Sequence, residues 1–110
     1  MLNQVILVGR LTNDPKLEKL ESGKTICKIT LACPRSYKNS EGCYDTDFID
    51  CLLQFGTAET TCEYCKKGDL LGIKGRIETN LYETDNGTKG KATEIIVEKA
   101  TFLSSRKENN

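Results

Sequence analysis

The segment KTICKITLAC, residues 24–33, decides the fold class, because its apolar residues recur at every second position. One parity carries the apolar side chains of Cys27, Ile29, Leu31 and Cys33. The other parity carries mainly polar side chains, among them Lys28 and Thr30. Such alternation is typical of a β-strand with one buried face. The segment therefore predicts a strand whose odd-numbered residues face a core.

Four further segments of the chain are also predicted strands. They are QVILVGRL (4–11), DFIDCLLQF (47–55), DLLGIKGRIETNLYET (69–84) and KATEIIVEKATFL (91–103). The first is almost entirely apolar, which predicts burial on both faces. In the second and third, odd-numbered apolar residues are predicted to face inward: Ile49, Cys51, Leu53, Phe55, Leu71, Ile73, Ile77 and Leu81. Turn-forming residues separate the strands at LESG (20–23), NSEG (39–42) and DNG (85–87).

One segment, TAETTCEYCKKG (57–68), changes period and predicts a short helix that stops at Gly68. The layout is therefore all-β, with five strands and one short helix between the third and fourth. This arrangement suits a small closed barrel such as the OB-fold, although periodicity alone leaves other small all-β barrels open. We expect residues 1–103 to form this one domain and residues 104–110 a short polar tail.

The composition narrows the functional classes. The 110 residues include 16 basic and 16 acidic side chains, giving zero net charge. No apolar run is long enough to span a bilayer, and the N-terminal segment lacks the features of a signal peptide, so we expect a cytoplasmic protein without a membrane partner. The chain has no His and no nucleophile or phosphate-loop motif. These features predict a non-enzymatic protein without a cofactor.

The six cysteines permit a second interpretation. Without a signal peptide they are expected to stay reduced, and most fit as small apolar residues in strands. Cys62 and Cys65 form a CxxC pair on the predicted helix, which is compatible with a thiol-based metal or redox protein. A zinc site would need two more ligands, and no second CxxC or His supplies them. Packing of one helix face is the simpler interpretation, with no metal bound.

Exposed aromatic residues give the sharper functional signal. Phe48 and Tyr82 fall on the polar parity of their strands, and Tyr37 lies between Arg35 and Lys38. Unpaired bases stack on exposed rings while Lys and Arg follow the phosphates, so single-stranded nucleic acid is a partner that suits this pattern. Isolated surface aromatics and burial in a subunit interface remain the alternatives.

Four segments resemble, in order and spacing, the bacterial-type single-stranded DNA-binding proteins. They are NQVILVGRLTNDP (3–15), TDFIDCLLQFG (46–56), KKGDLLGIKGRIET (66–79) and TEIIVEKATFL (93–103). The resemblance implies an OB-fold that binds single-stranded DNA without strong sequence preference, as a homotetramer, in DNA replication, recombination or repair. It also implies base stacking on Tyr37, Phe48 and Tyr82. Backbone contacts would come from Arg10, Lys38, Lys74 and Arg76.

The chain departs from the family pattern at several positions. Gln54 stands where the family has a further stacking ring, and Glu78, Asn80 and Leu81 occupy a segment that is often basic. These departures predict fewer phosphate contacts and a shallow salt dependence. The chain resembles short members that lack the acidic C-terminal tip, as in phages or mobile elements, so poor recruitment of replication and repair enzymes is expected. An OB-fold that binds RNA, or a primosome-like accessory protein, remains an alternative.

Overall fold

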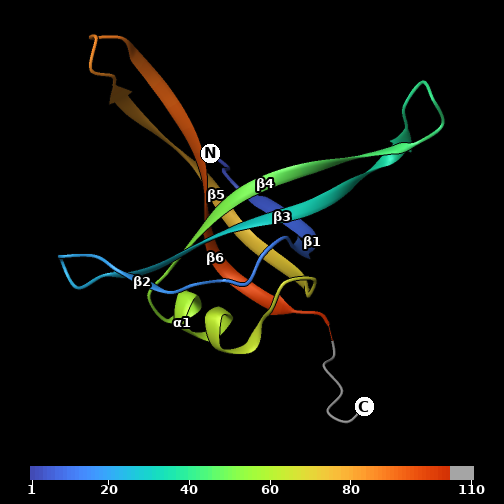
Figure 1. Cartoon of the computed structure of the whole chain (residues 1–110), viewed down its shortest axis with the longest axis horizontal. Coiled ribbons are helices and arrows are strands. Elements are labelled where there is room, and N and C mark those ends of the chain that lie inside the picture. The colour runs from blue at the N-terminus through green and yellow to red at the C-terminus, as the bar shows by residue number, and fades with distance from the viewer. Residues whose placement is uncertain (105–110) are drawn as a thin grey trace.

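A computed structural model describes residues 1–104, which form a β-barrel with one helix (Figure 1). The elements are β1 (Val5–Leu11), β2 (Glu18–Lys19), β3 (Thr25–Lys38), β4 (Tyr44–Gln54), α1 (Phe55–Tyr64), β5 (Leu70–Glu83) and β6 (Lys89–Phe102). β2 is a two-residue strand that pairs only with β3 and was not predicted. The five long strands correspond to the five predicted ones.

The barrel closes because β1 pairs with strands on both of its sides. The sheet runs β1-β5-β6-β4-β3, and β1 meets β3 again through Arg10↔Ala32 and Leu11↔Leu31. A Cβ at Gly9 would lie 2.7 Å from both the Ala32 carbonyl oxygen and Cys33 Sγ, so the absence of a side chain permits this close crossing. The closed five-stranded barrel, with its helix between the third and fourth long strands, confirms the predicted OB-type architecture.

The core lies inside the barrel and beneath α1. Its buried apolar residues come from every long strand and from the helix region: Leu11, Cys27, Ile29, Leu31, Cys51, Leu53, Ala58, Cys65, Leu71, Ile73 and Val97. Within the barrel, odd-numbered residues of β3 and β4 are buried, as the alternation predicts: Cys27, Ile29, Leu31, Cys51 and Leu53. The helix covers one end of the barrel, where Ala58 and Thr61 are fully buried.

Two long hairpins extend beyond the barrel and diverge from each other (Figure 1). We call them the β3–β4 arm and the β5–β6 arm. Antiparallel pairing continues along them to Lys38↔Tyr44 and to Glu83↔Lys89. The predicted turns are confirmed at their tips, where Gly42 N–H donates to the Asn39 carbonyl and Gly87 N–H to the Thr84 carbonyl.

The boundary between β4 and the helix differs from the prediction. The helix begins at Phe55 and ends at Tyr64, before Gly68, which instead lies in the turn leading to β5. Phe55 was predicted to face the core, but it adopts a positive φ of 55° at the strand-to-helix switch and is exposed. The abrupt change of backbone direction carries its ring out of the strand's inward register.

Four further residues predicted to be buried are exposed in the single chain. Ile77 and Leu81 keep the inward parity of β5 but lie where the β5–β6 arm has left the barrel, and Leu81 is 85% exposed. Ile6 and Val8 of β1 are also exposed, at 67% and 52%, because no layer of the described chain covers that outer face. Alternation identifies which residues share a face, but it does not show whether anything packs on that face.

The predicted tail at 104–110 lies outside the described residues except for Ser104. The Ser104 hydroxyl accepts a hydrogen bond from the Leu70 backbone N–H at 2.5 Å, so the domain is anchored one residue beyond its predicted end. Within residues 1–104, the single helix is too short to be a membrane-spanning segment.

Candidate nucleic-acid interface

A groove of about 480 Å³ lies between the β3–β4 sheet and the base of the β5–β6 arm. Residues from five segments of the chain line it: Asn13, Lys28, Ile29, Thr30, Asp50, Cys51, Asn80, Ala92, Thr93 and Glu94. Its walls are mixed in character, with one ammonium, two carboxylates and several amide and hydroxyl groups. The groove therefore offers hydrogen-bonding partners to a ligand more than it offers positive charge.

Phe48 lies on β4 next to this groove. Its ring is 67% exposed, and it shares the even-numbered face of the strand with Asp50, as the sequence alternation predicts. Its neighbour across the sheet is Ala32 on β3, which is too small to cover the ring. An apolar ring held on a regular strand with one face in water is a platform on which a planar group can stack.

Tyr82 occupies the corresponding place on the β5–β6 arm. Its ring is 52% exposed, and it shares the even-numbered face of β5 with the groove residue Asn80. Its antiparallel partner on β6 is Gly90. A Cβ at Gly90 would overlap the Tyr82 ring, reaching 2.8 Å from Cε1 and closer to Cζ and Oη. The ring therefore lies across the glycine, which the sequence analysis did not single out.

Tyr37 and Lys38 lie near the tip of the β3–β4 arm. Pro34 pairs with Thr46 and Lys38 pairs with Tyr44. Between these two pairs β3 has more residues than β4, so β3 forms a bulge there. Tyr37 lies in this bulge and is 59% exposed. The Lys38 Nζ stands 5.8 Å from the centroid of the Tyr44 ring, within cation–π range.

Tyr44 is a ring for which the family resemblance gave no role. It is exposed and lies on the same even-numbered face of β4 as Phe48, four residues away along the strand. Its parity could have been read from the sequence. The arm thus presents two aromatic residues on one face, with Lys38 beside the outer one.

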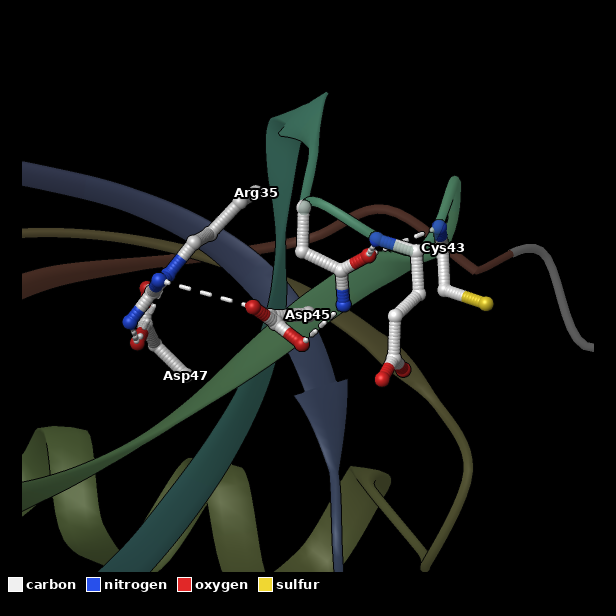
Figure 2. A network of polar contacts seen from close by, with 6 residues as sticks. Arg35, Cys43, Asp45 and Asp47 are labelled. Atoms are coloured by element: carbon white, nitrogen blue, oxygen red, sulfur yellow. Dashed lines mark hydrogen bonds and ion pairs between the residues drawn. The ribbon is translucent and has the colours of Figure 1, made fainter.

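Carboxylates neutralise Arg35 in the bulge of this arm (Figure 2). Its guanidinium contacts Asp47 at 2.9 Å and Asp45 at 3.7 Å, both on the neighbouring strand β4. Hydrogen bonding to Asp47 raises the pKa of Arg35, and hydrogen bonding to Arg35 lowers the pKa of Asp47. Arg35 therefore ties β3 to β4 across the bulge, and its charge is already matched on this arm.

The four predicted backbone-contact residues do not lie together. Lys38 is on the β3–β4 arm, whereas Lys74 lines an apolar depression on the outer face of β1 beside Ile6 and Val8. Arg76 is held by Glu78 and Glu98, and hydrogen bonding to these carboxylates raises its pKa.

Arg10, the remaining predicted contact, donates from Nη1 to the Gly68 carbonyl at 3.0 Å. The groove's own cation is Lys28, which lies on the same face of β3 as Thr30 and to which the sequence analysis gave no contact role.

The helix cysteines pack against the barrel. Cys65 is buried, and Cys62 lies beside Cys27, whose side chain is fully buried in β3. Burial, with the Cys62 side chain as a further cause, raises the pKa of the Cys27 thiol to about 12. Within residues 1–104, no group of three or more Cys, Asp or Glu side chains has the geometry of a metal site. The raised pKa of Cys27 disfavours its own thiolate, the form that metal binding or disulfide exchange requires.

Comparison with known proteins agrees with the family resemblance described in the sequence analysis. Residues 2–103 match the model of the single-strand binding protein family. The chain is 44% identical over 103 residues to single-stranded DNA-binding protein B of Bacillus subtilis, covering 94% of this chain and 91% of that protein. It is 43% identical over 106 residues to a single-stranded DNA-binding protein of Enterococcus faecalis, covering 96% of this chain and 56% of that protein. The chain belongs to the single-strand binding protein family.

Proposed function

We propose that this protein binds single-stranded DNA by stacking bases on Phe48, Tyr82 and Tyr37, with bases turned toward the groove and phosphates turned outward. The observation that carries the proposal is that exposed rings stand on both arms, on strand faces that border one groove. Base–aromatic stacking contributes about 1–3 kcal/mol per base and is tolerant of sequence. The names of the relatives, which specify single-stranded DNA, support the same ligand.

Electrostatic attraction plays a smaller part in this proposal. The chain has no net charge, Arg35 and Arg76 are paired with carboxylates, and two carboxylates line the groove. Lys28 and Lys38 are then the cations best placed to contact phosphates near the rings. Because each phosphate contact on a single strand adds about 0.7 to the log–log salt slope, a shallow dependence on salt is expected.

Self-association through β1 is the second part of the proposal. Along residues 5–9 one edge of β1 pairs with β5, while the other edge has no strand partner within residues 1–104. The exposed Ile6 and Val8 flank an apolar depression that Leu103 also lines. An open strand edge beside exposed apolar side chains favours pairing with a second copy. The homotetramer implied by the family resemblance would bury this surface.

A role in DNA replication, recombination or repair follows from the ligand, since all three expose single strands. The test is fluorescence anisotropy with a labelled thymidine oligonucleotide, in competition with unlabelled single-stranded DNA, duplex DNA and single-stranded RNA. Effective competition by single-stranded DNA and poor competition by duplex are expected. Stronger competition by RNA than by DNA would favour the RNA-binding alternative, and no binding at low salt would refute the proposal.

A further inference from the structure

We propose that Asp50 makes the groove prefer bases with an exocyclic amino group (cytosine, adenine and guanine) over thymine and uracil. This inference rests on the proposed function, because it concerns a base already stacked beside the groove. It adds a specificity determinant to a binding mode that stacking alone would leave indifferent to base identity.

The position of Asp50 relative to Phe48 is the first step. The two residues are two positions apart on the same face of β4, so their Cα atoms are separated by roughly 7 Å along the strand. Phe48 stands beside the groove, and Asp50 forms part of its wall. A base that stacks on the Phe48 ring therefore brings its edge within reach of the Asp50 carboxylate.

The carboxylate is held in place by its cross-strand neighbour. Thr30 pairs with Asp50 across the sheet, and the Thr30 hydroxyl donates to Asp50 Oδ1 at 2.6 Å. Within residues 1–104, Oδ2 accepts no hydrogen bond. A carboxylate oxygen only accepts hydrogen bonds, so the open oxygen of Asp50 calls for a donor on the ligand.

The opposite wall of the groove also presents a carboxylate, that of Glu94. Asn80 of β5 donates to Glu94 Oε1 at 3.3 Å, so this second carboxylate is also oriented by a neighbour. Asp50 and Glu94 repel phosphate groups, which favours a strand that enters with its bases toward the groove. Lys28 is the groove residue that can meet the backbone.

The bases differ in whether their edges present a hydrogen-bond donor or an acceptor to a carboxylate. Cytosine presents its N4 amino group, a donor that Asp and Glu recognise in nucleic-acid complexes. Adenine and guanine also carry amino groups. Thymine and uracil present the O4 carbonyl at the corresponding position, and their one ring N–H stands between two carbonyl oxygens. A carboxylate is repelled by these oxygens, so Asp50 should discriminate against both bases.

The test compares oligodeoxycytidine with oligodeoxyuridine of equal length, binding to the full chain at pH 8, where cytosine is neutral. Uridine is used because it lacks the thymine methyl group. One hydrogen bond to a charged group predicts a roughly ten- to hundredfold tighter complex with cytidine. Equal affinities, or tighter binding of uridine, would overturn the inference while leaving the proposed function intact. Binding of neither oligonucleotide would refute the proposed function itself.

The variant Asp50→Asn separates base selection from general charge effects. The amide can donate to O4 as well as accept from N4, so the ratio of cytidine to uridine affinities should fall toward one, while uridine binding should hold or improve. Glu63→Gln, on the exposed surface of α1, removes the same charge away from the groove and should keep the ratio. A cytidine preference that survives in Asp50→Asn, with unchanged circular dichroism, would overturn the assignment.

Discussion

The ring of Tyr82 lies against Gly90, its antiparallel partner across the β5–β6 arm. The arm projects beyond the barrel (Figure 1), and Tyr82 is not part of the hydrophobic core formed by the described residues. The absence of a side chain at residue 90 is what lets an aromatic ring settle across the neighbouring strand, as occurs when an aromatic residue covers a strand glycine. This pair gives the proposed binding surface a platform on an otherwise isolated hairpin.

The first prediction concerns that pair. Gly90→Ala adds a Cβ that overlaps the Tyr82 ring and should push it aside, weakening single-stranded DNA binding by no more than Tyr82→Ala does. Anisotropy titrations of both variants and of the double variant measure the effect. In the Tyr82→Ala background the added Cβ should change nothing, and a further loss in the double variant would mean that Gly90 acts independently of the ring.

The second prediction concerns the stacking rings themselves. Phe48→Ala and Tyr82→Ala should each weaken binding by about 1–3 kcal/mol, because each removes one platform without opening the core. Tyr64→Ala serves as a matched control, since Tyr64 is an exposed ring on α1 that packs near Phe102 rather than at the groove. A loss with Tyr64→Ala as large as with Phe48→Ala would show that exposed rings matter here for another reason.

Alternation in the sequence predicted the strands and the outward direction of Phe48 and Tyr82, because a regular strand fixes the side of each residue. It could not predict that Leu81 and Ile6 are exposed. The exposure of Leu81 depends on where the arm leaves the barrel, and that of Ile6 on what covers β1. The ion pair between Arg76 and Glu98 could not be predicted from the sequence either, because the bulged β5–β6 pairing brings together residues that are far apart in sequence.

The third prediction separates paired from unpaired cations. Arg76→Ala should leave the salt slope of DNA binding almost unchanged, because Glu78 and Glu98 already neutralise the guanidinium. Lys28→Ala should lower the slope by about 0.7, the value of one phosphate contact on a single strand. Titrations at several salt concentrations measure both. A larger change with Arg76→Ala than with Lys28→Ala would mean that DNA displaces the carboxylates.

The fourth prediction concerns self-association. Val8→Glu places a charge on the exposed apolar face of β1 and should shift the protein toward monomers, as measured by analytical ultracentrifugation. Leu17→Glu alters another exposed apolar residue, outside β1, and should leave the assembly unchanged. If Val8→Glu folds normally and sediments like the unmodified protein, the β1 face is not the interface.

The fifth prediction concerns pH. Burial raises the pKa values of Cys27 and Cys51 to about 12, so the folded state holds these protons more tightly than the unfolded chain does. Their contribution to stability is complete below about pH 8.5 and should be lost as pH rises toward 12. Urea unfolding at pH 7 and at pH 10.5 measures the loss, which should be smaller in Cys27→Ala. Equal pH dependence in that variant would contradict the assignment to Cys27.

The central claim is that bases stack on the rings of the arms, and tyrosine fluorescence tests it most directly. The chain contains four Tyr and no Trp, so its intrinsic emission comes from tyrosine. Titration with a thymidine oligonucleotide should quench this emission in step with binding measured by anisotropy. The quench should shrink in Tyr82→Phe, which keeps a stacking ring and should keep the affinity. Binding without any change in tyrosine emission would contradict stacking and indicate contact through the phosphates alone.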